Sequence, residues 1–328
     1  MAEPLEKRVA GAPDDGPPPQ AHEFPGCLAV RVPAEQLDDF DGRIEYWDAR
    51  NQIAIVAEAA TSYHEYGAQR FAACVKMIAM RRGSPIDVIG ATWLVVRGEG
   101  GERLRLLAAD QVAYLHPAET RPTGPEIERG VNALPDVLLE VDYSTDVRRR
   151  KLGIYESWGF PEVWVDVPDA SWHYRPKSRR SALTIYVLEG GRYIETPSSR
   201  AFPGWTAEAI HRALNEHEAS LQTVDTLRRV ADTLAAAEGT GPDDDPLLRR
   251  ERAEGRAEGR AEGRQQERLE IVRVAVHEAL AARGLAPPPA LGAWFEQLDH
   301  IADPAPLIRL AWECRDADDF LRRARGRA

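Results

Sequence analysis

The chain has 328 residues, of which 43% are hydrophobic, and its formal net charge is −11. This length allows one large domain with an appendage, and the acidic balance argues against a protein that holds nucleic acid mainly through a broad basic surface. The three cysteines are far apart, and the sequence shows no signal peptide or long apolar segment. We therefore expect a soluble, cytoplasmic protein with reduced thiols and no membrane partner.

The first part of the chain predicts a disordered start and then a mixture of strands and helices. Residues 1–22 are rich in proline, glycine and charge, which is typical of disorder. Residues 53–56 predict a strand, and residues 63–82 predict a helix with one apolar face. Residues 87–97 and 104–107 predict a pair of strands around a glycine-containing turn.

A β-α-β passage follows in the middle of the chain. Residues 137–141 and 162–167 are short apolar runs separated by a helical pattern, and such a passage favours a mixed sheet flanked by helices. Residues 183–188 and 192–194, joined by two glycines, predict a late hairpin. We therefore expect an α/β domain that covers residues 23–205.

Glu140 interrupts an otherwise apolar strand, Val137–Val141. A carboxylate at such a position is costly unless a cation, a hydrogen-bond network or a metal ion contacts it. Glu140 is therefore the first candidate for a functional residue.

The helix after this strand carries a lysine on its apolar face. Thr145 or Asp146 is suited to cap the helix, and Gly159 is suited to end it. Four residues spaced at i, i+4, i+8 and i+11 share one face of the helix: Val147, Lys151, Tyr155 and Trp158. Helical side chains lean toward the N-terminus, so the ammonium of Lys151 should point back toward Glu140.

The C-terminal part is a different kind of sequence, with a helix expected over residues 206–237, a linker over 238–247 and a helical tail over 248–328. Residues 253–264 repeat Ala-Glu-Gly-Arg. Glu and Arg of the repeat lie two or six positions apart, so they miss the helical i,i+3 and i,i+4 pairings, and each glycine costs up to about 1 kcal/mol against alanine. We expect this helix to need a partner, most simply the same helix of a second chain or the helix over residues 207–237. A solvated helix is the alternative.

The middle of the chain resembles the Uma-two restriction endonuclease family, a branch of the PD-(D/E)XK nuclease superfamily. The residues that carry the resemblance are Pro135, Asp136, Glu140, Val141, Lys151, Tyr155, Gly159, Pro161, Glu162, Trp164 and Asp166. The segment from Glu45 to Asp48 is similar to the early glutamate segment of the family, and Asp110 to its first metal-binding aspartate. The resemblance covers about residues 24–200 and implies a restriction-endonuclease-like mixed sheet flanked by helices, with an α-helical C-terminal extension outside it.

The same resemblance implies an endonuclease that hydrolyses DNA phosphodiester bonds with Mg²⁺ or Mn²⁺. Asp110 and Glu140 would hold the metal, Lys151 would assist the attacking water, and Glu45 would be an auxiliary acid. Hard carboxylate oxygens suit Mg²⁺, and an ammonium beside the ion stabilises developing charge. The superfamily usually has its lysine two residues after the acid, where this chain has Asp142, so the resemblance implies that Lys151 stands in from the helix.

Each candidate residue also has a purely structural interpretation. Asp110 fits a turn or a strand end, Glu140 a buried salt bridge, Lys151 a surface lysine with a buried stem, and Glu45 an exposed strand residue. Three consecutive arginines are candidates for phosphate contacts, although runs of charge are often only solvated: Arg148, Arg149 and Arg150.

The tail resembles the C-terminal helices of recombination-promoting transposase-like nucleases, which also carry Glu-Gly-Arg repeats. This resemblance implies an oligomerisation or partner-binding tail rather than chemistry. We expect a homodimer formed through the tail, and DNA as the other partner. Two further readings remain open: a nuclease fold without activity that binds nucleic acid, and an interaction scaffold that acts through its helical tail.

Overall fold

The computed structural model describes residues 20–57, 62–142, 146–169, 180–287, 289–298 and 303–326. The segment 1–22, predicted to be disordered, lies outside this range except for its last three residues, which lead into a 3-10 turn, Ala21–Glu23. Thr145, one of the two expected helix caps, also lies outside the described residues. The chain divides into two compact units, Met1–Leu248 and Arg249–Ala328.

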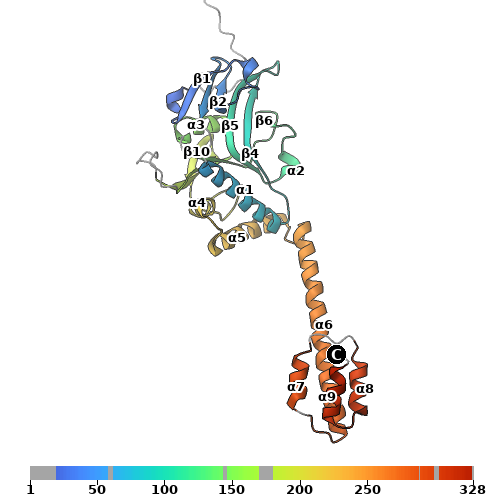
Figure 1. The fold of residues 1–328 in the computed structure, drawn as a ribbon. Helices are drawn as coiled ribbons and strands as arrows, with labels where there is room; N and C mark the ends of the chain where they lie inside the picture. The colour runs from blue at the N-terminus through green and yellow to red at the C-terminus, as the bar shows by residue number, and fades with distance from the viewer. Residues whose placement is uncertain are drawn as a thin grey trace, which may run out of the picture. The chain divides into compact units, whose positions relative to one another are not determined.

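The first unit is built on one mixed sheet, which confirms the predicted α/β class (Figure 1). In the described part of the chain, ten strands belong to it: β1 Cys27–Arg31, β2 Arg43–Asp48, β3 Ile53–Ala57, β4 Asp87–Arg97, β5 Arg103–Tyr114, β6 Glu126–Glu128, β7 Val137–Val141, β8 Glu162–Val167, β9 Ala182–Glu189 and β10 Arg192–Thr196. The order is β1-β3-β2-β5-β7-β8-β9-β10, and β4 pairs with β5 and β6. The pairs β7–β8 and β4–β6 are parallel, and the other pairs are antiparallel.

Strand β5 is longer than the predicted segment 104–107. It continues through Asp110 to Tyr114, because its backbone pairs with β4 and β7 beyond Asp110. The Asp110 carboxylate accepts hydrogen bonds from the neighbouring strands. Asp110 is therefore a residue within a central strand.

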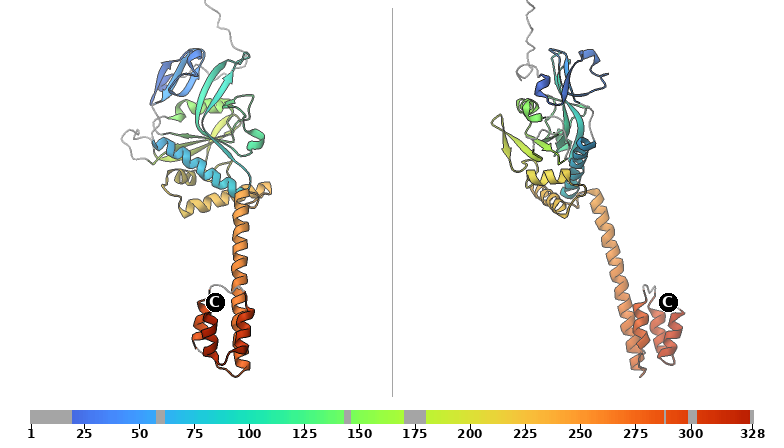
Figure 2. Two further views of the ribbon diagram at one scale, coloured as in Figure 1. Left: turned by 45° about the vertical axis from the view of Figure 1, so that its right-hand side comes forward. Right: turned by 60° about the vertical axis from the view of Figure 1, so that its left-hand side comes forward.

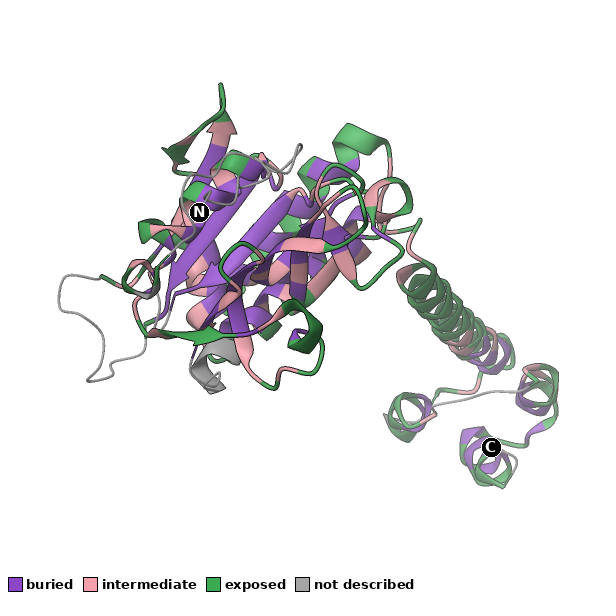
Figure 3. Ribbon diagram, turned by 90° about the horizontal axis from the view of Figure 1, so that it is seen from above, coloured by how far each residue is buried: buried purple, intermediate pink, exposed green. Residues whose placement is uncertain are grey.

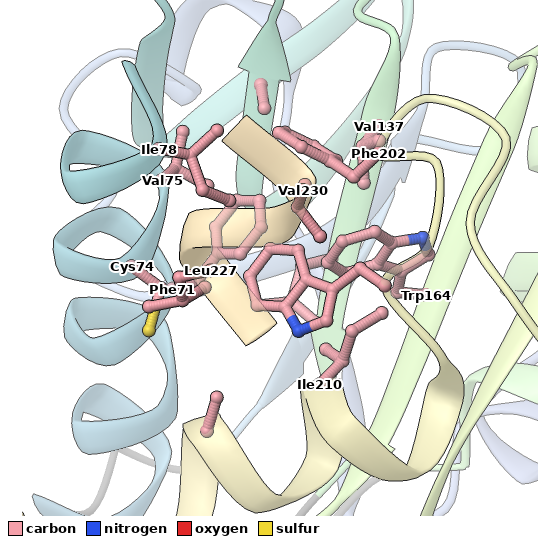
Figure 4. Close-up of a cluster of buried hydrophobic side chains, with 14 of the residues drawn as sticks. Phe71, Cys74, Val75, Ile78, Val137, Trp164, Phe202, Ile210, Leu227 and Val230 are labelled. Carbon is pink, nitrogen blue, oxygen red and sulfur yellow. The ribbon is translucent and has the colours of Figure 1, made fainter. Parts of the chain in front are cut away.

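Helices cover both faces of this sheet (Figure 1). In the first unit they are α1 Ser62–Arg82, α2 Pro117–Thr120, α3 Lys151–Trp158, α4 Ala207–Asn215 and α5 Leu221–Glu238. On one face, α1, α4 and α5 pack around Trp164 of β8 (Figure 4). On the other face, Tyr155 and Trp158 of α3 pack in a second core. Side chains alternate along a strand, so β7 places Leu139 in the first core and Leu138 in the second.

The helix predicted over residues 206–237 is in fact two helices, and the sheet domain does not end at residue 205. Thr206 caps α4 by accepting a hydrogen bond from the Ala209 amide, and Ser220 caps α5 by accepting one from the Thr223 amide. The apolar periodicity continues across the break, which is why the sequence suggested one helix. Both helices contribute to the core under the sheet, so they belong to the first unit.

The linker between the units is shorter than the predicted 238–247. α5 ends at Glu238 with Gly239 in the left-handed conformation, φ 71°, which glycine adopts without strain. The next helix, α6, begins at Pro246 and continues to Ala282.

The second unit is helical, as predicted for the tail. It contains most of α6 together with α7 Pro289–Glu296, α8 Ala305–Glu313 and α9 Ala317–Arg325, which gather beside the C-terminal part of α6 (Figure 2). Their core joins Val272, Val276 and Leu280 of α6 to side chains of the three short helices. The part of α6 that carries the repeat is helical and exposed (Figure 3). Within the described residues, no helix combines the length and the apolar character that a membrane span needs.

Candidate functional site

Three strands and one helix bring the candidate residues together on the face of the sheet that α3 covers. Glu140 lies on β7, Asp110 on the neighbouring strand β5, and Glu45 on β2, which pairs with β5. Lys151 is the first residue of α3. The structure therefore places Asp110, Glu140 and Lys151 in one location with Glu45 beside them, although their chemical roles stay predictions.

With Arg43, which is half-buried, these buried side chains form a row of alternating charges. We call it the charge network: Asp110, Arg43, Glu45, Lys151 and Glu140. Its centre is the Lys151 ammonium, which donates hydrogen bonds to Glu45 Oε2 at 2.7 Å and to Glu140 Oε2 at 2.9 Å. The three side chains are only 3–4% exposed. Lys151 is thus a fully buried cation between two carboxylates, and the interpretation as a surface lysine is wrong.

Arg43 continues the network from Glu45 to Asp110. Its Nη2 donates to Asp110 Oδ1 at 3.0 Å, and its Nε lies 3.1 Å from Glu45 Oε1. The second oxygen of Asp110 accepts a hydrogen bond from the Val141 amide at 2.8 Å. This last contact ties β5 to the end of β7, next to Glu140.

A β-bulge explains how Glu45 reaches the helix. In the pairing of β2 with β3, Ile44 and Tyr46 lie opposite consecutive residues, so Glu45 has no partner of its own. Bulges re-aim side chains and are frequent next to active sites. Tyr46 packs in the core under α3 while Ile44 packs in a separate cluster, so the bulge lets Glu45 face α3 together with Tyr46.

Tyr155 completes the surroundings of Glu140. Its hydroxyl contacts Glu140 Oε1 and also lies 3.2 Å from the Ala108 carbonyl oxygen. A single hydroxyl proton cannot serve both acceptors fully. The hydroxyl donates to Glu140 Oε1, and the Ala108 carbonyl oxygen is a second acceptor within reach of the same hydroxyl.

Burial and the neighbouring charges shift the pKa values of Glu140 and Lys151. Burial raises the pKa of Glu140 to about 8; Lys151 opposes the shift, whereas Asp110 and Glu45 add to it. Burial alone would lower the pKa of Lys151, but the surrounding carboxylates raise it above its ordinary value. Lys151 is therefore charged at neutral pH.

The three arginines predicted to contact phosphates lie at the start of α3 and outside the charge network. Arg148 donates to Asp146 at 2.9 Å, Arg149 lies 3.9 Å from the same carboxylate, and Arg150 lies 3.9 Å from Glu23. Arg148 and Arg149 are also exposed to solvent.

Asp146 does not cap the helix as the sequence suggested, because its carboxylate pairs with these arginines instead. Asp142 accepts from the Val147 amide and supports the 3-10 turn Val147–Arg149. The helix proper starts after that turn, at Lys151.

The donors around the network decide how a divalent ion could be held. Among the described residues, no group of three or more His, Cys, Asp or Glu side chains is arranged as a metal site. All four oxygens of Asp110 and Glu140 already contact donors from Arg43, Val141, Lys151 and Tyr155. The kind of donor nevertheless fits, because carboxylate oxygens suit Mg²⁺ and three carboxylates here face two cations. A divalent ion would have to replace some of the present contacts.

A second buried acid lies on the opposite face of the sheet and was missed as a site. Asp166 of β8 is fully buried, and its Oδ1 lies 2.6 Å from Nδ1 of His211 on α4. Nε2 of the same ring lies 3.1 Å from Asp169 and 3.0 Å from Ser181. Burial raises the pKa of Asp166, while hydrogen bonds from His211 and Asn215 oppose the shift. The sequence signal was an acid inside an apolar strand, as for Glu140.

Comparison with known proteins adds little. No protein-family model matches the chain, and no curated protein matches it. Among solved structures, a protein of the DUF820 family from Anabaena variabilis, described as a candidate nuclease, is similar at 10% identity with a TM-score of 0.35. The match covers 61% of this chain and 99% of that one. A likeness this weak supports no statement about chemistry, so any function must be argued from the residues themselves.

Proposed function

We propose that this protein is a Mg²⁺- or Mn²⁺-dependent endonuclease that hydrolyses DNA phosphodiester bonds. The observation that carries the proposal is the buried ammonium of Lys151 held between Glu45 and Glu140, with Asp110 on the adjacent strand. A protein does not stabilise itself efficiently in this way, because buried ion pairs seldom recover the cost of removing their charges from water. Clusters of this kind with strongly shifted pKa values are typical of functional sites.

Asp110 and Glu140 would hold the ion, which supplies an activated water and neutralises charge on the phosphate. Lys151 has a different task. Its ammonium is fixed by two hydrogen bonds, so its remaining donor can orient the attacking water or stabilise the charge that develops on the phosphate. Glu45 keeps that ammonium in place, and Tyr155 fixes the orientation of the Glu140 carboxyl.

DNA would approach this acidic protein through a local basic surface. Arg148 and Arg149 are exposed at the turn that leads into Lys151. Their ion pairs with Asp146 lie at the surface and contribute little free energy, so phosphate groups can compete for these arginines. Arg148 and Arg149 are therefore the proposed contacts to the DNA backbone, three and two residues before Lys151.

We further propose that the protein is a homodimer formed through α6, since cutting both DNA strands suits a two-fold pair of sites. Ile271 and Val274 lie one helical turn apart on α6 and are exposed, at 54% and 45%. The expected result is that the full-length protein sediments as a dimer and that Ile271→Glu with Val274→Glu sediments as a monomer. A monomeric wild-type protein at tens of micromolar, roughly the range for a modest helical interface, contradicts the dimer.

Cleavage of supercoiled plasmid DNA tests the endonuclease itself. Wild-type protein should nick the plasmid with Mg²⁺ or Mn²⁺ and stop when a chelator is added. Glu140→Gln should lower the rate by about a hundredfold or more, the size expected when a group that stabilises the transition state is removed. Glu156→Gln is the matched control, because Glu156 lies on the same helix as Lys151 but bonds to Tyr193 of β10. Intact plasmid with both ions, or full activity of Glu140→Gln, contradicts the proposal.

A further inference from the structure

Arg43 differs from the other members of the charge network in its exposure. Its side chain is 29% exposed, whereas Asp110 is 8% exposed and the remaining three are less so. Arg43 can therefore change its contacts toward solvent without uncovering the buried pairs of Lys151.

The position of its guanidinium is that of a cation shared by two acids. Nη2 donates to Asp110 Oδ1 at 3.0 Å, and Nε lies 3.1 Å from Glu45 Oε1. The guanidinium is thus hydrogen-bonded to Asp110 and ion-paired with Glu45. Asp110 is one of the two proposed metal ligands, and its other oxygen is engaged by the Val141 amide. An ion that binds Asp110 through Oδ1 must take the place of Arg43.

We propose that Arg43 is an internal competitor for the divalent ion, so that binding of the ion requires the guanidinium to give up Asp110. This inference rests on the proposed function, because it concerns the same site. Arg43 keeps its ion pair with Glu45 in the exchange, and Lys151 keeps both of its carboxylates. The competition lowers the affinity for the ion and leaves the buried centre of the network intact.

The order of stability within the network supports this assignment. Removing Lys151 from its partners would leave buried Glu140 without a cation and buried Glu45 with Arg43 alone, which is costly. Moving Arg43 away from Asp110 uncovers only a carboxylate that the ion then neutralises. Of the two cations in the network, Arg43 is therefore the one that an incoming ion displaces.

Calorimetric titration of chelator-treated, full-length protein with Mn²⁺ tests the competition without any measurement of activity. Arg43→Gln should bind Mn²⁺ about tenfold more tightly than the wild type, which corresponds to about 1.4 kcal/mol. Arg43→Lys should lie between them, because lysine keeps the positive charge but lacks the planar set of donors with which the guanidinium reaches both acids. The matched control is Arg50→Gln, since Arg50 follows the same strand and pairs with Asp48 at 2.7 Å. This substitution also removes one positive charge, and it should leave the affinity for Mn²⁺ unchanged.

The outcomes separate this inference from the proposed function. If the wild type binds Mn²⁺ and Arg43→Gln binds it no more tightly than Arg50→Gln does, Arg43 is not a competitor and the metal site stands. If neither the wild type nor any variant binds the ion, both the proposed metal site and the proposed competition are wrong. Thermal melting without metal checks that Arg43→Gln is folded. If Arg43→Gln does not fold, the Mn²⁺ affinity of Arg43→Lys is compared with that of the wild type instead.

Discussion

The charge network and the repeat of α6 use the same residue types in opposite surroundings. In the network, each acid lies 2.7–3.1 Å from a cation and at least nine-tenths of each acidic side chain is buried. In residues 253–264, Glu and Arg alternate along an exposed helix, and their spacing misses the helical pairings. Burial therefore decides how much a charged side chain depends on its partner. Removing the partner of a buried charge costs much stability, whereas removing the partner of an exposed charge costs little.

Lys151→Met should give the largest effect, because it leaves Glu45 and Glu140 buried without an ammonium. We expect a loss of about 3–5 kcal/mol in the free energy of unfolding near pH 8. The pKa of Glu140 is already raised to about 8 by burial, and losing Lys151 raises it further. In the folded variant, the Glu140 carboxylate therefore binds a proton as the pH falls. The loss in the free energy of unfolding becomes smaller toward about pH 5. Urea unfolding at both pH values measures this; a loss that does not depend on pH contradicts it.

His211→Asn should give an intermediate effect, since its partners are one buried and one exposed acid. Burial alone would lower the pKa of His211, but Asp166 and Asp169 raise it above 6.5. The charged ring thus stabilises the folded state fully below pH 6.5, and this stability is lost as the pH rises through the raised pKa. Ser181 and Asn215, which also face the ring, are uncharged. We expect the variant to lose about 1 kcal/mol of unfolding free energy near pH 5.5 and less near pH 9. Thermal melting at both pH values measures this.

Gly259→Ala should stabilise the repeat helix by up to about 1 kcal/mol. A Cβ at this position meets no atom within 4 Å, so the substitution removes backbone freedom without adding a clash. Hydrogen exchange of the amides around residue 259 should slow, while exchange in the sheet unit stays the same. Faster exchange in the helix would mean that the glycine faces a close partner.

Arg260→Gln should give the smallest effect. Arg260 is exposed and its neighbouring glutamates lie at unfavourable spacing, so the melting temperature should change by no more than about 1 °C. A clear destabilisation would show that the repeat makes contacts as ordered as those of the charge network.

The sequence predicted the elements whose signals are local. The apolar run around Glu140 became β7 with the bounds expected, and the helical phase of Lys151 correctly placed it on the buried face. The helix break at residues 216–220 was missed, because the apolar periodicity runs across it.

Contacts between distant strands could not be predicted from local patterns, and only the family resemblance placed Glu45 and Asp110 near Glu140. Arg43 meets Asp110 only because β2 pairs with β5, and Glu45 faces α3 only because of a bulge. His211 reaches Asp166 across the packing of α4 on the sheet. None of these contacts depends on a local sequence pattern, so they could not be predicted from periodicity or residue spacing. Tyr155 was predicted to be buried, yet its bond to Glu140 could be seen only in three dimensions.

The central claim is that the charge network holds a divalent ion through Asp110 and Glu140. Electron paramagnetic resonance of chelator-treated protein with added Mn²⁺ measures this directly, because bound and free ions give distinct signals. The account predicts that the wild type binds Mn²⁺ and that Asp110→Asn and Glu140→Gln each weaken binding at least about tenfold, with Glu156→Gln unchanged. Binding that both variants retain in full, or a wild type that binds no ion, would contradict it.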